Sequence, residues 1–198
     1  ATATSSLTVY NDSSNINELI GAALNGGATE DYFGYSVSVS SDGTTAAIGA
    51  FWADPNSKSN SGQVQVYRLI SGQWSEIGSF EGAAADDWFG WSVSISSDGN
   101  TVAIGARWAD PRGFNSGQVQ VYHYSGSSWT QKGSSINGAA AGDYFGKSVS
   151  VSSDGNTVAV GAHGADPNSK VESGQVRVHH NSGSSWTPKG LSIDGGET

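Results

Sequence analysis

Cysteine is absent from this sequence of 198 residues, and so is methionine. Without cysteine the chain has no disulfide and no thiolate to offer a metal ion, although the absence is neutral about its compartment. Long apolar runs are missing as well. No stretch approaches the roughly 20 residues of a membrane-spanning helix, and no secretory signal peptide is present. Insertion into a membrane is therefore not expected.

Charged residues are few, and basic ones are fewest. Lys and Arg number 9 against 18 Asp and Glu, which gives a formal net charge of −9. Charged residues make up 14% of the chain, compared with an average of about 25%. Nucleic-acid binding relies on basic side chains that neutralise phosphates. Nucleic acid is therefore excluded as an expected partner.

Glycine, by contrast, is abundant, with 28 residues. Gly, Ser, Asn and Thr separate short apolar runs, as in all-β proteins with many turns. One glycosylation sequon, at Asn11, slightly favours a secreted protein. The sequence leaves open whether Asn11 is glycosylated.

A repeated unit of about 56 residues dominates the sequence. Each copy opens with Asp-aromatic-Phe-Gly and continues through a Ser-rich segment to Ser-Asp-Gly. Phe33, Phe89 and Phe145 follow one another at steps of 56 residues. A Trp recurs at steps of 55 and 57, at Trp74, Trp129 and Trp186. Residues identical in all units are expected to serve the scaffold, with these Trp rings packed between repeats.

Each unit is predicted to form four short antiparallel strands, called a to d here. In the second unit, residues 93–96 alternate apolar and polar side chains, residues 101–106 are apolar or small, and residues 117–122 alternate again. A Ser-Asp-Gly turn joins strands a and b, and strand d runs over residues 129–133. This pattern predicts an all-β fold, a β-propeller of four-stranded antiparallel blades. A β-solenoid, whose coils are usually shorter, or a sandwich, which seldom repeats so closely, is the alternative.

The repeats resemble the FG-GAP repeats of integrin α-subunit propellers. The similarity rests on Phe-Gly at the start of strand a, Ala-Ile-Gly-Ala at the end of strand b and Gly-x-Val-x-Val-Tyr in strand c. It covers nearly the whole chain, and related repeats occur in many secreted and surface proteins of microbes and algae. The resemblance implies a propeller with an adhesive or ligand-binding role, and it does not imply catalysis.

The turn between strands a and b departs from the calcium-binding members of that family. Their Asp-x-Asp-x-Asp-Gly loop gives the cation several carboxylate oxygens. Here the turn is Ser40-Ser41-Asp42-Gly43, with one carboxylate, and the other two copies match. The metal sites of the family are therefore not expected in these turns.

The repeat divides the chain into a half blade and three blades, residues 1–28, 29–84, 85–140 and 141–198. The half blade is predicted because residues 6–27 match strands c and d of the second blade without a gap. A competing interpretation is a short helix, with Asn15 as N-cap and Glu18 three residues later. The ungapped match outweighs it.

About three and a half blades leave a ring unfinished, since closed propellers usually have four to eight. The chain is either a segment of a longer protein, or it closes with copies of itself or a partner chain, or it forms an irregular four-bladed ring. Two copies would both bring a half blade of strands c and d, with no strands a and b to complete it. A fragment or a partner-completed assembly is therefore favoured.

Positions that differ between the repeats indicate a recognition surface. They follow either the Phe-Gly pair or strand b: Tyr35, Trp52, Trp91, Arg107, Trp108, Lys147 and His163. The d–a and b–c connections emerge at the same end of a propeller, which by the resemblance is the face that integrins use for ligands. Aromatic rings beside cations suit sugar stacking or a protein hot spot, so a carbohydrate or protein ligand is expected. The alternative is that these side chains only fill the seams between blades.

Six repeated aspartates are the candidates for a cation site: Asp31, Asp54, Asp87, Asp110, Asp143 and Asp166. Three of them precede Pro in the b–c loop, and the other three lie in the d–a loop at the same end. The alternative is that each one stabilises a turn through backbone hydrogen bonds. No cofactor is expected, apart from a calcium ion at such a site.

Nothing in the sequence predicts catalysis. The four His have no repeated carboxylate or metal-ligand spacing, and the many Ser lack a His/Asp partner pattern. The repeated aspartates could supply the two acids of a glycosidase, but their recurrence in every blade indicates architecture. The sequence therefore predicts a non-catalytic extracellular or cell-surface module for adhesion or recognition. The alternative is a structural subunit that assembles with other chains into a filament, sheath or larger complex.

Overall fold

The computed structural model describes residues 6–7 and 21–196. This part of the chain is all-β, with three large antiparallel sheets in sequence order and two 3-10 turns, η1 (Pro55–Ser57) and η2 (Pro167–Ser169). The sequon at Asn11 and residues 8–20 of the predicted half blade lie outside the described residues. Neither 3-10 turn in the described part is long or apolar enough to cross a membrane.

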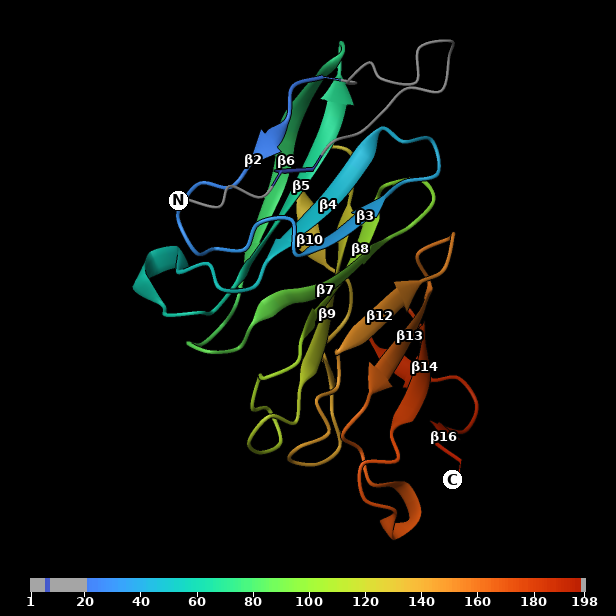
Figure 1. Ribbon diagram of the computed structural model, residues 1–198. Helices are drawn as coiled ribbons and strands as arrows, with labels where there is room; N and C mark the ends of the chain where they lie inside the picture. The colour runs from blue at the N-terminus through green and yellow to red at the C-terminus, as the bar shows by residue number, and fades with distance from the viewer. Residues whose placement is uncertain (1–5, 8–20, 197–198) are drawn as a thin grey trace.

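Each large sheet is one blade (Figure 1). Blade 1 contains β3 (Ser36–Val39), β4 (Thr45–Ala50), β5 (Gln63–Ile70) and β6 (Gln73–Glu81). Blade 2 contains β7 (Phe89–Ile95), β8 (Thr101–Ala106), β9 (Gln118–Tyr124), β10 (Trp129–Gln131) and β11 (Ile136–Asn137). Blade 3 contains β12 (Ser148–Val151), β13 (Thr157–Ala162), β14 (Gln175–Asn181), β15 (Trp186–Pro188) and β16 (Ile193–Asp194). The propeller-blade prediction is confirmed.

Strand d differs from the prediction in two blades. In blade 1 it is the continuous strand β6, whereas in blades 2 and 3 it is split, so that β10 and β11 both pair with β9, and β15 and β16 both pair with β14. The cause is one extra residue between the repeated Trp and the apolar residue that pairs with the first Val of strand c, which is Phe80 in blade 1 and Ile136 in blade 2. Gly133, with φ of 72°, lies in the resulting break.

The N-terminal segment also contributes a strand pair. β1 (Ser6–Leu7) and β2 (Leu24–Asn25) run antiparallel, with Leu7 opposite Leu24. In blade 2, Val119 lies opposite Ile136 at the same offset along the chain. The described part of this segment therefore has the register that a half blade requires. The boundaries assigned to the half blade and to the three blades stay predictions.

The Phe-Gly pair attaches each blade to the one before it. The Phe89 amide donates to the Ser61 carbonyl at 3.0 Å, and the Phe145 amide donates to the Ser116 carbonyl at 3.1 Å. Both Phe side chains are 1% exposed, and burial of such a side chain contributes about 1.5–3 kcal/mol. The inner strands β3, β7 and β12 consequently lie side by side along the middle of Figure 1.

The outer end of each seam is filled by the repeated Trp, as the sequence predicted. A Cβ placed on Gly78 would lie 2.6 Å from the Trp129 ring, and one on Gly133 would lie 3.1 Å from the Trp186 ring. The Trp186 indole also donates to the Lys132 carbonyl at 2.6 Å. These Trp residues therefore belong to the scaffold, while the opposite ends of the strands carry the variable loops.

Candidate functional site

Aromatic side chains gather at the end of the blades where strand d leads into strand a and strand b leads into strand c. The residue before each Phe-Gly pair contributes to this end, with φ of 53° at Tyr32, 54° at Trp88 and 51° at Tyr144. Bulky residues rarely adopt positive φ. The same conformation in three blades shows that the docked Phe-Gly pair fixes it, so that these rings project consistently into the loop face.

Seven rings from blades 1 and 2 form one continuous group, which we call the loop-face cluster: Tyr32, Tyr35, Phe51, Trp52, Trp88, Trp91 and Trp108. Its centre is Trp88, which stacks on Trp108 with ring centroids 3.5 Å apart and on Trp91 with centroids 5.4 Å apart. Phe51 of blade 1 lies 4.9 Å from Trp91. Two blades thus contribute to a single surface.

The exposure of the rings varies across the loop-face cluster. Phe51 is buried at 6% exposure, Tyr32 and Tyr35 are exposed at 48% and 47%, and the four Trp residues are half-buried. The variable aromatic residues therefore meet on this face, as predicted. They also pack against each other across the seam, which was the alternative, and they keep one side open to solvent.

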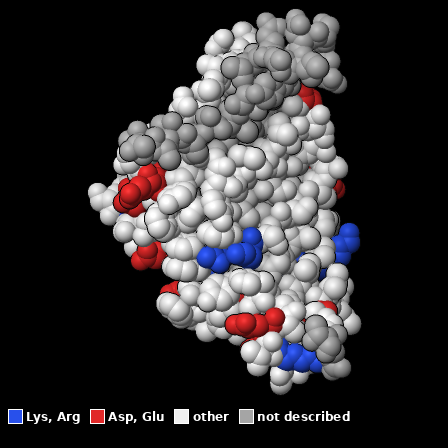
Figure 2. Space-filling view, viewed as in Figure 1, with Lys and Arg blue, Asp and Glu red and all other residues white. Residues whose placement is uncertain are grey.

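Two cations lie over Trp91. The Arg107 guanidinium carbon is 3.8 Å from the ring centroid, and the Lys147 ammonium is 4.7 Å from it. Burial lowers the pKa of Arg107, and burial together with the charge of Arg107 lowers the pKa of Lys147. Figure 2 shows one group of basic side chains near the centre of the face in view, and others at its right edge and at its lower end, where they lie close to acidic ones.

His163 lies at the blade 3 end of this surface, where it packs on Tyr144 with ring centroids 5.1 Å apart. Burial, followed by the charges of Lys147 and Arg107, lowers the pKa of His163 below its usual 6.5. The lowered pKa favours the neutral imidazole, which offers one hydrogen-bond donor and one acceptor. The guanidinium carbon of Arg107 lies 5.9 Å from the Tyr144 ring centroid, so Arg107 connects the loop-face cluster with the Tyr144–His163 pair.

Several donors at this face have no acceptor within the described residues. They are the indole N–H groups of Trp52, Trp88 and Trp108 and the Nε–H of Arg107. Buried donors normally find a partner, and leaving one unpaired costs about 1–3 kcal/mol. These atoms are buried beneath the open side of the rings, so they add to the cost of packing this surface and are not themselves accessible to a ligand.

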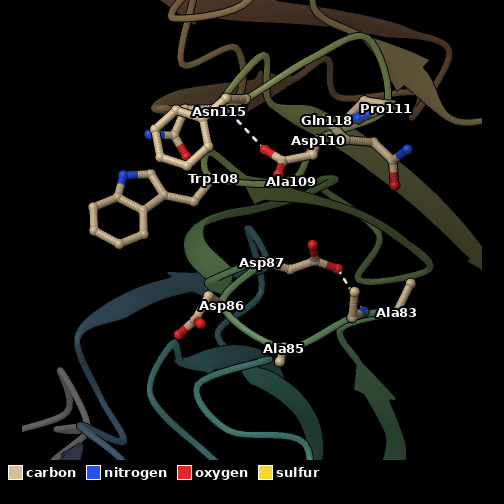
Figure 3. Close-up of a pocket in the computed structure, with 12 residues that line it drawn as sticks. Ala83, Ala85, Asp86, Asp87, Trp108, Ala109, Asp110, Pro111, Asn115 and Gln118 are labelled. Atoms are coloured by element: carbon tan, nitrogen blue, oxygen red, sulfur yellow. Dashed lines mark hydrogen bonds between the residues drawn. The ribbon is translucent and has the colours of Figure 1, made fainter.

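A cavity of about 540 Å³ adjoins Trp108 between the d–a and b–c loops of blade 2. Its wall combines the apolar Trp108 and Phe114 with Asp86, Asp87 and Asp110. Figure 3 shows the Asp87 and Asp110 carboxyl groups, each held by a loop amide. Phe114 is 74% exposed, and burial raises the pKa of Asp87. The cavity thus offers rings and hydrogen-bonding groups side by side.

The repeated aspartates accept hydrogen bonds from their own loops. Asp54, Asp110 and Asp166 each accept a backbone N–H five or six residues further on. Asp87 accepts the Ala84 amide, and Asp143 accepts two amides, from Ala139 and Ala140. In the described part of the chain no three His, Cys, Asp or Glu side chains gather closely enough to hold a metal ion. The turn interpretation accounts for these residues, and calcium binding there stays an untested expectation.

Of the seven residues predicted to bind a ligand, six lie in the loop-face cluster or over it, and His163 lies at its edge through Tyr144. Sequence reasoning did not select Tyr32, Trp88 and Tyr144. The residue before Phe-Gly is aromatic in every copy, and the comparison between repeats looked for a recognition surface after the Phe-Gly pair and after strand b. Its size and positive φ, visible only in the structure, place it at the centre of the surface.

Three consecutive antiparallel blades joined by the same Phe-Gly seam define a protein of the β-propeller class. The model of the FG-GAP repeat matches the chain three times, over residues 22–67, 81–122 and 135–178. The chain belongs to the FG-GAP repeat family, as the sequence resemblance indicated. No curated protein matches it.

Solved structures with a similar fold are distant in sequence. A "putative 6-phosphogluconolactonase" from Bacteroides fragilis is 13% identical, with a TM-score of 0.60 over 94% of this chain and 48% of its own. One of the same description from Bacteroides uniformis is 12% identical, with a TM-score of 0.57 over 94% and 50%. A functionally unknown protein from Desulfotomaculum acetoxidans is 12% identical, with a TM-score of 0.55 over 89% and 44%. The chain spans about half the length of these proteins, and the likeness shows the fold alone.

Proposed function

We propose that this chain is a non-catalytic recognition module that works outside the cell or on its surface and binds a glycan, or a protein, through the loop-face cluster. The observation that carries the proposal is the Trp88–Trp91–Trp108 stack with Arg107 and Lys147 over it. Trp and Arg are the residues that most often dominate binding energy at recognition sites.

A carbohydrate suits this surface better than a flat protein partner. The apolar face of a sugar ring stacks on an aromatic ring, and its hydroxyls require acceptors and donors close by. The cavity beside Trp108 supplies carboxylates next to apolar side chains, and its volume of about 540 Å³ lies within the range of about 300–1,000 Å³ for small-ligand sites.

Catalysis is not part of the proposal because the acids near the surface are engaged in the loops. Asp87 and Asp110 each accept a loop amide, and Asp143 accepts two. These hydrogen bonds hold each carboxylate in its loop, and equivalent bonds recur in other blades. The carboxylates therefore stabilise the loops. An extracellular setting is supported by the family, whose repeats are common in secreted and surface proteins.

The proposal is tested by a glycan array probed with the labelled protein, with and without EDTA. We expect binding to a defined set of sugars that EDTA does not change, since the aspartates are used by the loops. Trp91→Ala and Trp108→Ala should each weaken binding at least tenfold, because a hot-spot Trp contributes about 2 kcal/mol or more and tenfold corresponds to about 1.4 kcal/mol.

The matched control is Tyr124→Ala, which removes a half-buried aromatic ring from the end of β9 opposite to the b–c loops. This variant should bind like the parent protein, and circular dichroism should show all three variants folded. If both Trp variants keep full binding to every sugar or protein detected, the loop-face cluster is not the site and the proposal fails.

A structural role is the second candidate, and the outer face of blade 3 favours it. Val176, Ile193 and Leu191 are exposed there at 38%, 63% and 94%. Apolar strands left open in this way invite assembly with another chain. Mass measurement in solution separates the candidates, because an obligatory structural subunit does not persist as a soluble monomer.

A further inference from the structure

The outer face of blade 3 contains a second cavity, of about 380 Å³. It lies between the start of β12, the end of β13, the start of β14 and β16. Gly161, Gly174, Val176 and Ile193 are among the residues that line it. None of the rings of the loop-face cluster lines it, but Lys147 and His163, which lie beside that cluster, form one edge.

The equivalent places in the other two blades are filled. In blade 2, Gly105 and Gly117 are in tight contact with the backbone of Phe145 and Gly146. In blade 1, Gly49 and Gly62 are in tight contact in the same way with the backbone of Phe89 and Gly90. By the repeat, Gly161 and Gly174 are the third pair of this kind. The cavity on blade 3 therefore has the form of a Phe-Gly socket.

The apolar residues that border the socket are exposed in blade 3 and buried in blade 2. Val119 and Ile136, which border the filled socket of blade 2, are 0% and 5% exposed. Their equivalents Val176 and Ile193 are 38% and 63% exposed. Covering them removes apolar surface from water, which favours an occupant of the same shape and chemistry as the one seen in blades 1 and 2.

Polar groups of the socket are placed for the same hydrogen bonds. In the two filled seams, a Ser hydroxyl donates to the carbonyl of the Phe-Gly glycine, at 2.7 Å for Ser36 and 2.8 Å for Ser92. A second Ser hydroxyl accepts a strand amide, at 3.1 Å for Ser38 and 3.0 Å for Ser94. Ser148 and Ser150 are the blade 3 equivalents. They place the same donor and the same acceptor towards an incoming Phe-Gly segment.

We propose that this socket binds the opening segment of one further FG-GAP blade, with the sequence pattern Asp-aromatic-Phe-Gly-x-Ser. A second copy of this chain does not supply the segment as folded. All three of its Phe-Gly pairs are already docked, with Phe33, Phe89 and Phe145 exposed by only 2%, 1% and 1%. The site is thus a peptide-recognition site of defined chemistry, and it shares only Lys147 and His163 with the proposed ligand face.

The direct test uses the protein with an isotopic label and a synthetic peptide that has the sequence of residues 141–151. We expect amide chemical-shift changes at Ser148, Gly161 and Ser173–Val176, with a dissociation constant on the order of 1 mM or tighter. A peptide in which Gly146 is replaced by Ala should bind at least tenfold more weakly. In the filled socket a Cβ at that position would lie 2.7 Å from the Gln118 carbonyl oxygen, and the residue has φ of 90°.

A pair of protein variants separates binding from folding. Gly161→Ala fills the socket, and within blade 3 its Cβ is crowded only by the Ser148 side chain, so the variant should fold and lose the peptide. Gly105→Ala is the matched control, since its Cβ would fall on the Gly146 carbonyl oxygen in the filled seam, and it should lower the melting temperature instead.

Three results would overturn the proposal. The first is the absence of shifts at several millimolar peptide, and the second is equal binding by the parent protein and Gly161→Ala. The third is a dimer in sedimentation experiments that Gly161→Ala converts to a monomer, because the occupant would then be a second copy. None of these results bears on the glycan array, so failure of this site and failure of the proposed ligand face are distinguishable.

Discussion

At the scale of the residue, each seam depends on glycine positions opposite aromatic rings. Gly78 faces Trp129, and Gly133 faces Trp186, which also donates its indole N–H to Lys132 across the same seam. Protein interiors are packed so closely that one added methyl group is felt by its neighbours. These glycines are needed for the space they leave, in addition to any freedom of the backbone.

The substitution Gly78→Ala tests this requirement. Its Cβ would lie 2.6 Å from the Trp129 ring, and we expect the free energy of unfolding to fall by about 1–3 kcal/mol, the usual cost of overpacking. Urea denaturation followed by Trp fluorescence measures it. Gly27→Ala is the control, since no atom lies within 4 Å of its added Cβ. Equal stability of both variants would show that the ring moves aside freely.

At the scale of the element, the Ser-Asp-Gly turn is a self-contained unit between strands a and b. In blade 1 the Ser40 hydroxyl and the Thr44 amide both donate to Asp42, and the Thr45 amide donates to Ser40. Gly43 completes the turn with φ of 71°. The single carboxylate is therefore consumed within the turn, and the absence of calcium from these turns stays a prediction.

The third turn predicts a sensitivity to acid. Hydrogen bonds from the Ser152 hydroxyl and then from Asn156 lower the pKa of Asp154 from 3.8 to about 2. Its contribution to stability is complete above pH 3.8 and is lost as the pH falls towards 2. The variant Asp154→Asn should lose less stability than the parent protein between pH 4 and pH 2. Thermal melts across that range measure the difference, and parallel curves would contradict it.

At the scale of the whole molecule, the two filled seams differ in their aromatic content. Between blades 1 and 2, Tyr122 stacks on Phe80 with ring centroids 4.2 Å apart. Between blades 2 and 3, the equivalent residues are His179 and Ile136. His179 is 8% exposed, and neither ring nitrogen has a hydrogen-bond partner within the described residues. The second seam therefore contains a buried group that can titrate.

Docking of blade 3 should consequently depend on pH. Burial, and then the charge of Arg177, lowers the pKa of His179 below 6.5. The unfolded chain thus takes up a proton at a higher pH than the folded protein, and stability falls as the pH drops below about 6.5. His179→Tyr should lose less stability between pH 7.5 and pH 5. His180→Gln removes an exposed imidazole from the same strand and should lose as much stability over this range as the parent protein. If His180→Gln reduced the loss and His179→Tyr did not, the assignment to His179 would be wrong.

The sequence by itself determined the all-β repeat, the position of strand b, the scaffold role of the repeated Trp and most of the residues that meet on the loop face. Spacing sufficed because each strand must bury the same faces in every blade. The split of strand d in blades 2 and 3 was missed, since one inserted residue changes pairing only when neighbouring strands are in place.

Only the tertiary structure decided which rings stack and which cavities are filled. Trp88 and Trp108 are distant in sequence, and their contact arises because the d–a and b–c loops emerge at one end of the blade. The Phe-Gly socket of blade 3 has the same glycines, serines and valine as the filled ones, so sequence comparison cannot distinguish it. Its state depends on what packs against it, which is a property of the assembled seam.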